Sequence, residues 1–283
     1  MAKTAVMKVW NVELGLAVHV KAPNGKFIVI DLGTGTNNSS PLLKLRWVDI
    51  NYMIITHPHL DHFDDILSFD VNQPKILRRC HALSDEEIMA NATDQNRKKF
   101  EKYVEVCNRY NQSVELTDED NPLISDNYGG LKMQLFHTDQ CSHDNFNNFS
   151  DIIIFTLATC KVVVCGDNEK ASLDILMKQK AFKDAIANAD VLVAPHHGRE
   201  SGYHQEFVNT VNPTLTIVSD TSKIAASAAT KYTNASSGWT VMDRKGKSST
   251  RYCLTTRNDG DIEVDFGESD DPNYTGSLGV YLI

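Results

Sequence analysis

The segment Thr56-His57-Pro58-His59-Leu60-Asp61-His62 gathers three imidazoles and one carboxylate in a short stretch of chain. Neutral imidazole nitrogens and carboxylate oxygens suit Zn²⁺, and they also suit Mn²⁺ or iron when oxygen ligands are added. A loop this tight can direct alternate side chains at two different cations. We therefore expect His57, His59, Asp61 and His62 to bind metal, rather than to form a chance group of surface histidines.

Two later segments have the same design, in which a buried strand ends in a polar ligand. The metal loop follows the apolar run 51–56, Asp167 follows the apolar run 162–165, and His196 and His197 follow the apolar run 191–194. Ligand sites in layered α/β folds lie beyond the carboxyl ends of such strands. We expect the three segments to share one rim, with Asp167 either bridging two cations or capping a helix, or doing both.

The rest of the chain alternates between short strand-like runs and helical stretches. Strands are expected at 6–12, 17–22, 26–30, 131–136, 151–157, 161–165, 191–194, 214–218, 252–255 and 262–266. Helices are expected at about 84–111 and 171–189, and Asn258-Asp259-Gly260 is typical of a hairpin turn. Two β-rich halves with helices fit one α/β sandwich of two sheets covered by helices. We expect a single domain over 1–283, with a helical insertion at about 64–130 that shapes specificity, and a tail at 278–283 that forms either a final strand or an interface edge.

Composition limits the partners and the compartment. The chain has 283 residues and a net charge of −9, which counts against a broad surface for duplex nucleic acid but leaves room for a local basic groove. The cations Arg97, Lys98, Lys99 and Lys102 are interpreted as a solvated helix face, with a patch that contacts the substrate as the alternative. Six scattered cysteines without close pairs favour a reduced, cytoplasmic setting, and no segment is apolar enough for a leader or a membrane span. Neither a protein partner nor a homo-oligomer can be read from composition, and both stay open.

Taken together, the HxHxDH loop, the later Gly166-Asp167 and the Ala194-Pro195-His196-His197-Gly198 ending resemble the metallo-β-lactamase superfamily, and specifically its competence-protein (ComEC-type) hydrolase branch. The early turn 23–26, the run 30–33 and the element Asn147-Asn148-Phe149-Ser150 occur in the family's order, so the resemblance covers most of the chain. It implies a four-layer αββα sandwich.

The resemblance also implies a role for each ligand. His57 and His59 would hold one metal, Asp61 and His62 the other, and Asp167 would bridge them. One of His196 and His197 would complete the ligand set of the second metal, while the other would face the substrate as an acid or an electrostatic stabiliser. Which of the two does which is left open.

The first metal in this family usually has a third histidine, for which the sequence offers two candidates. His137 ends a strand and is the preferred candidate, His143 precedes the Asn147-Asn148 element, and either could be a bystander because the ComEC-type branch often lacks this ligand. Asp31 is expected to support the ligands through hydrogen bonds. Ser150 and Ser201 are interpreted as a strand cap and a loop hydroxyl.

These residues favour a hydrolase in which two divalent metal ions, Zn²⁺ or Mn²⁺, lower the pKa of a shared water. Its substrate would be a phosphodiester, either nucleic acid or a small molecule such as a cyclic nucleotide. Hydrolysis of an ester, lactone, thioester or amide is the rival reading, because the fold hosts many chemistries. A metal-stabilised interaction module without catalysis is a third.

Overall fold

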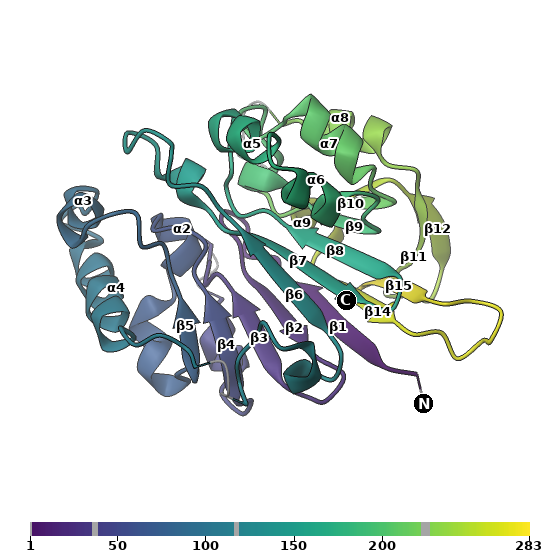
Figure 1. Ribbon diagram of the computed structural model, residues 1–283, viewed down its shortest axis with the longest axis horizontal. Coiled ribbons are helices and arrows are strands. Elements are labelled where there is room, and N and C mark those ends of the chain that lie inside the picture. The colour runs from purple at the N-terminus through teal and green to yellow at the C-terminus, as the bar shows by residue number, and fades with distance from the viewer. Residues whose placement is uncertain (1, 36–38, 116–118, 222–226) are drawn as a thin grey trace.

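Two β-sheets pack face to face and helices cover both outer faces (Figure 1). The computed structural model describes residues 2–35, 39–115, 119–221 and 227–283. This four-layer αββα arrangement is the fold class that the sequence predicts. The chain passes from the larger sheet to the smaller one and back, so residues far apart in sequence meet at the edges of the sheets.

The larger sheet has nine strands within the described residues, in the order β12-β11-β15-β14-β1-β2-β3-β4-β5. Their bounds are β1 Thr4–Val9, β2 Val18–Lys21, β3 Phe27–Ile30, β4 Ile50–Ile54, β5 Ile76–Arg78, β11 Trp239–Met242, β12 Ser248–Arg251, β14 Ile262–Gly267 and β15 Ser277–Leu282. Neighbours β3, β4 and β5 run parallel, so their carboxyl ends point to one edge of the sheet.

The smaller sheet has six strands within the same residues, in the order β13-β10-β9-β8-β7-β6. Their bounds are β6 Lys132–Phe136, β7 Ile152–Leu157, β8 Cys160–Val164, β9 Val191–Val193, β10 Leu215–Val218 and β13 Cys253–Thr255. Strands β8, β9 and β10 are parallel, which again brings carboxyl ends to a common edge.

The helices are short, and none among the described residues is both long and apolar enough to cross a membrane. The α-helices are α1 Pro41–Lys44, α2 Leu60–Phe63, α3 Asp85–Ala90, α4 Arg97–Arg109, α5 Lys170–Leu176, α6 Lys180–Ile186, α7 Gln205–Val211, α8 Ala229–Ala235 and α9 Thr256–Asp259. The 3-10 helices are η1 Ile66–Val71, η2 Ser125–Tyr128, η3 Phe146–Phe149 and η4 Pro195–Gly198.

Alternating side chains along the strands build three apolar layers. In β4, Ile54 faces the core between the sheets, whereas Met53 packs against the helices outside the larger sheet. In β8, Val164 faces the same central core and Val163 packs against the helices outside the smaller sheet. Because successive side chains of a strand point to opposite faces, strands that are apolar on both faces require this four-layer burial.

The insertion differs in detail from the sequence-based expectation. The helix expected over 84–111 is two helices, α3 and α4: a capping box between Ser84 and Glu87 begins the first, and Asn91 ends it. Strand β5 lies inside the expected insertion, yet it pairs with β4 at the edge of the larger sheet. Residues 116–118 of the insertion lie outside the described part of the chain.

The C-terminal part corrects one expectation and decides another. The predicted hairpin at Asn258-Asp259-Gly260 is wrong, because these residues belong to and follow α9, and the chain there passes from β13 in the smaller sheet to β14 in the larger one. The tail forms strand β15, which pairs with β14 on one side and β11 on the other. It is therefore an internal strand rather than an exposed edge.

Candidate metal centre

Three strand ends meet at one rim of the sandwich. The loop that contains His57 and His59 follows β4, and Asp61 and His62 lie in the single turn of α2. Asp167 follows β8, and the turn η4 with its two histidines follows β9. Since β4 belongs to the larger sheet while β8 and β9 belong to the smaller one, the ligands are brought together from both sheets.

The turn η4 has an unusual backbone that separates two adjacent imidazoles. His196 and His197 both adopt left-handed conformations, with φ of 48° and 52°, and Gly198 follows at 67°. Left-handed backbone costs a non-glycine residue about 1–2 kcal/mol. Such strain persists where the surroundings impose it and is concentrated at functional sites.

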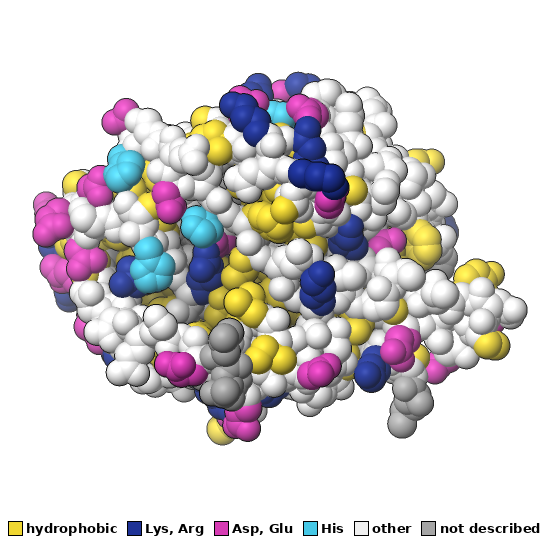
Figure 2. All heavy atoms as spheres, in the orientation of Figure 1, with side chains coloured by type: hydrophobic (Ala, Val, Ile, Leu, Met, Phe, Trp, Pro, Cys, Tyr) yellow, Lys and Arg dark blue, Asp and Glu magenta, His cyan; other side chains and the backbone are white. Residues whose placement is uncertain are grey.

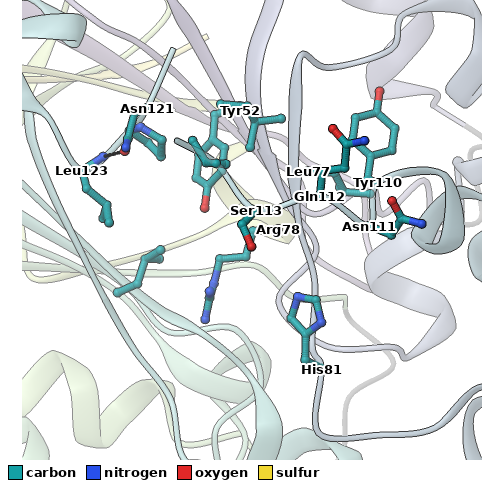
Figure 3. A pocket seen from close by; sticks show the side chains of 14 residues that line it. Tyr52, Leu77, Arg78, His81, Tyr110, Asn111, Gln112, Ser113, Asn121 and Leu123 are labelled. Carbon is teal, nitrogen blue, oxygen red and sulfur yellow. Dashed lines mark hydrogen bonds between the residues drawn. The ribbon is translucent and has the colours of Figure 1, made fainter. Parts of the chain in front are cut away.

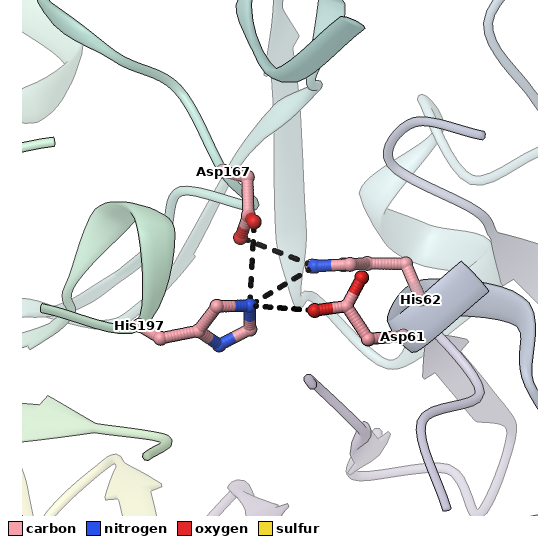
Figure 4. Close-up of side chains that lie close together, drawn as sticks. All are labelled: Asp61, His62, Asp167 and His197. Carbon is pink, nitrogen blue, oxygen red and sulfur yellow. Dashed lines mark hydrogen bonds and ion pairs between the residues drawn. The ribbon is translucent and has the colours of Figure 1, made fainter. Parts of the chain in front are cut away.

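Four side chains converge at the centre of the rim (Figure 4). Asp61, His62, Asp167 and His197 each offer one ligand atom, and these atoms lie within 4.8 Å of one another. Nε2 of His197 lies 3.3 Å from Nε2 of His62 and 3.2 Å from Oδ2 of Asp167. Two ring nitrogens that face each other at this distance, beside two carboxylates, form the donor set of a divalent cation.

His57 and His59 form a second pair beside this group. Nε2 of His57 lies 3.0 Å from Nδ1 of His59, so the two rings direct nitrogens at a common point. Burial is the main cause that lowers the pKa of both histidines, and for His57 neighbouring His62 lowers it further. Both rings are therefore neutral at neutral pH, which is the form that binds a metal.

The charges of the first group balance each other within the protein. Burial by itself lowers the pKa of His197, but Asp167 and Asp61 outweigh burial and raise it to about 9. The same holds for His62: burial lowers its pKa, but Asp167 and Asp31 outweigh burial and raise the pKa well above the usual value. Burial raises the pKa of Asp167, yet the two imidazoles hold it well below its usual range. Metal-free protein thus keeps this group as buried ion pairs.

Hydrogen bonds from outside the group fix the orientation of both imidazoles. Nδ1 of His62 donates to Oδ2 of Asp31 at 2.7 Å, and Nδ1 of His197 donates to the Ser219 carbonyl at 3.0 Å. Both rings are left with Nε2 free to face the centre, which is how proteins hold metal-binding histidines. Asp31 itself is fully buried and accepts hydrogen bonds from the backbone and the hydroxyl of Thr56, as its predicted supporting role requires.

His196 lies at the mouth of the centre rather than within the group. Its Nε2 is 3.8 Å from Oδ2 of Asp167, and its Nδ1 is 2.9 Å from Oε1 of Glu169 and 2.8 Å from Oγ of Ser201. The carboxylate and the hydroxyl contact the same ring nitrogen, so the three side chains are not a relay that activates a serine. Ser201 is therefore a loop hydroxyl, as expected.

Two residues of the rim were given no role in the site by the sequence analysis. Glu169 follows Asp167 in the same loop and accepts hydrogen bonds from His196, Asn147 and Asn145; the bond from His196 is the largest of the effects that lower its pKa to about 2. Asn147 lies in η3, beside His59. The only sequence signal for Glu169 is an acid two positions beyond a predicted ligand, and an Asn is rarely counted among metal ligands.

The structure brings neither candidate for a third histidine into the centre. The side chain of His137 is 43% exposed and contacts Arg78 and Asp151. The side chain of His143 is 47% exposed and lies 2.5 Å from Oε1 of Glu87, at the start of α3. Both rings are thus engaged with other groups.

A polar pocket opens beside the centre. It has a volume of about 340 Å³ and is lined by His59, Phe146, Asn145 and Asp144 on one side and by Glu87, Asn91 and His143 among others. Helix α3 of the insertion forms one wall of this pocket. A second cavity of about 350 Å³ lies between the edges of the sheets around Tyr52, Arg78 and Tyr110 (Figure 3), and no residue of the metal centre lines it.

The side chains present fit two divalent cations. His62, His197, Asp61 and Asp167 would hold one, and His57 and His59 would hold the other with Asp167 within reach of both groups. Imidazole nitrogens and carboxylate oxygens in this ratio are common to zinc and manganese sites.

Comparison with known proteins found a matching family model and several similar solved structures. The family model of the metallo-beta-lactamase superfamily matches residues 11–219. Igni18, a metallo hydrolase from Ignicoccus hospitalis, is 19% identical with a TM-score of 0.44, over 75% of this chain and 81% of that one. The metallo-beta-lactamase fold protein YhfI from Bacillus subtilis is 14% identical with a TM-score of 0.41, over 77% and 88%.

A third similar structure is a diphosphatase from the PhnP family. It is 13% identical with a TM-score of 0.41, and the match covers 94% of this chain and 99% of that one. Sequence comparison with curated proteins gave no match.

Proposed function

Because the chain belongs to the metallo-β-lactamase superfamily, a superfamily of metal-dependent hydrolases, we propose that it hydrolyses a phosphodiester with two divalent cations at the centre formed by His57–His62, Asp167 and His197. The observation that carries this proposal is the convergence of ligand atoms of Asp61, His62, Asp167 and His197 within 4.8 Å. Bound cations would lower the pKa of water and offset negative charge on a phosphoryl oxygen.

The protein's own residues would orient and protonate the substrate. His196 presents Nε2 at the mouth of the centre, while Glu169 and Ser201 fix its Nδ1. With a carboxylate on Nδ1, the ring is held ready to carry a proton on Nε2 and to give it to the leaving oxygen. We assign His197 to the metal and His196 to the substrate, because only His197 lies inside the group.

The pocket beside His59 favours a small phosphodiester over a long nucleic acid. It carries the carboxylates of Glu87 and Asp144, which repel a chain of further phosphates. On the face in Figure 2, acidic side chains gather over the end of the molecule formed by α3 and α4. Two of the four cations expected there are paired, since Lys99 contacts Asp64 and Lys102 contacts Asp70. The order of motifs favours the ComEC-type branch, and a reduced cytoplasmic setting fits the unpaired thiols.

The test compares substrates and variants in one assay. Protein loaded with Mn²⁺ or Zn²⁺ is offered bis-p-nitrophenyl phosphate, cyclic nucleotides, single- and double-stranded DNA, and p-nitrophenyl acetate. We expect phosphodiester turnover that falls at least about 1,000-fold in Asp167→Ala, because one carboxylate serves both metals. His137→Ala is the matched control and should keep full activity. Turnover of the acetate alone would replace the proposal with carboxylic ester hydrolysis.

A further inference from the structure

The metal site at His57 and His59 lacks the third histidine that the sequence analysis sought at His137 or His143. His137 and His143 are engaged elsewhere, as described above. Two imidazoles and a share of Asp167 leave a cation with few protein ligands. The amide of Asn147 lies beside this gap, because it contacts His59.

The amide oxygen of Asn147 is buried, and its side chain lies beside His59. Asn147 is only 8% exposed, and no donor meets its Oδ1 in hydrogen-bonding geometry. A buried carbonyl oxygen without a partner destabilises the folded protein, so such an atom is expected to have a ligand, an ion or an ordered water. The side chain is close enough to His59 to counter part of the lowering of that histidine's pKa by burial.

Glu169 determines which end of this amide faces the centre. Nδ2 of Asn147 donates to Oε1 of Glu169 at 3.1 Å, and a carboxylate cannot accept from the amide oxygen. Asn145 secures the same geometry twice, because its Oδ1 accepts from the Asn147 backbone at 3.1 Å and its Nδ2 donates to Glu169 at 3.0 Å. The oxygen of Asn147 is thereby turned away from Glu169.

We propose that Oδ1 of Asn147 is the third protein ligand of the metal held by His57 and His59, and that Glu169 is the positioning residue that keeps this oxygen directed at the metal. The inference rests on the proposed two-metal centre. An amide oxygen in place of an imidazole makes the site harder, and hard oxygen ligands favour Mn²⁺ over Zn²⁺ relative to a site with three histidines. The exchange of ligand type thus sets metal preference.

Metal binding, rather than turnover, tests this assignment. Metal-free proteins are titrated with Mn²⁺ and with Zn²⁺, and stoichiometry and affinity are followed by calorimetry and by electron paramagnetic resonance of Mn²⁺. Wild type should bind two Mn²⁺ with a spin-coupled signal. Asn147→Leu keeps the branching at Cγ but removes the oxygen. It should bind the ion held by Asp61, His62, Asp167 and His197 unchanged, and the ion held by His57 and His59 about 100-fold more weakly, since even indirect ligand support is worth 10–100-fold. Asn147→His should bind two ions and shift the Zn²⁺-to-Mn²⁺ affinity ratio of the first site at least tenfold towards Zn²⁺.

His137→Ala is the control, because the ring of His137 contacts Arg78 and Asp151 outside the metal centre. Its two-metal stoichiometry should persist. Unchanged Mn²⁺ binding in Asn147→Leu, an equal loss in His137→Ala, or an unaltered metal preference in Asn147→His would each overturn the assignment while the two-metal hydrolase stands. A wild-type protein that binds fewer than two ions would overturn both. If Asn147→Leu unfolds, the metal preference of Asn147→His decides.

Discussion

Metal binding at the group of Asp61, His62, Asp167 and His197 should release protons. In the metal-free protein the pKa of His197 is about 9 and that of His62 is also raised, so both rings are protonated near neutral pH. A cation binds the neutral ring and must displace these protons. His57 and His59 are neutral already, because burial lowers the pKa of both. The two sites should therefore differ in proton release.

The magnitude follows from the pKa of His197. At pH 7 a ring with a pKa of about 9 lies two pH units below its midpoint, so its deprotonation costs about 2.7 kcal/mol. For each such proton, metal affinity should rise about tenfold per pH unit between pH 7 and 9. The second ring adds to this slope in the same direction.

Calorimetry in buffers of different ionisation enthalpy measures the protons directly. At pH 7 we expect at least two protons to be released at the group that contains His197, and none from His57 and His59. His137→Ala should leave the count unchanged, since that ring lies outside the centre. Metal affinity that is flat between pH 7 and 9, with fewer than one proton released, would refute the description of this group as buried ion pairs.

Other predictions concern the surroundings of the centre. Asp31→Asn should weaken metal binding about 10–100-fold, because Asp31 orients His62. Calorimetry measures the affinity, and the circular dichroism spectrum should stay unchanged. An unchanged affinity would show that the hydrogen bond between Asp31 and His62 is not needed for metal binding. Arg78→Met should lower the free energy of unfolding, measured in urea, by about 3 kcal/mol, because it leaves the buried carboxylate of Asp151 without its cationic partner. Metal binding should be unchanged. A decrease in the free energy of unfolding below about 1 kcal/mol would mean that water replaces Arg78. The folded-state pKa of His197 lies above its unfolded value, so its contribution to stability is complete below about pH 6.5 and is lost as the pH rises through 9. Metal-free protein should therefore melt at a lower temperature at pH 9 than at pH 6.5, and a higher melting temperature at pH 9 would contradict the assigned charges.

Sequence patterns were sufficient to predict the features that depend on a single segment of the chain. A buried strand that ends in His57, in Asp167 or in His196 predicts a shared rim, because parallel strands expose their carboxyl ends together. The layers were predictable for a similar reason, since runs such as Val162–Val164 are apolar on both faces. These features depend on one segment at a time or on a rule common to all strands.

What the sequence did not predict depends on contacts between distant segments. The turn residues Asn258-Asp259-Gly260 are typical of a hairpin, but which sheet the next strand joins is decided by the partners of β13 and β14, not by the turn. His137 has the right position at a strand end, yet its ring lies with Arg78 and Asp151. Glu169 and Asn147 are 22 residues apart in the sequence, and their role in the site became apparent only from the hydrogen bond between them.

The origin of the ligands in both sheets has a consequence for the core that separates them. Asp61 and His62 follow a strand of the larger sheet, whereas Asp167 and His197 follow strands of the smaller one, so the distance between the sheets sets the size of the metal site. A bound ion stabilises the folded chain by about 2.7 kcal/mol at 100 times its Kd, and this free energy acts on the packing of sheet against sheet. Metal affinity therefore depends on that packing. Replacing Phe155, which lies fully buried between the sheets, with a smaller residue should lower the affinity for a cation that Phe155 does not contact.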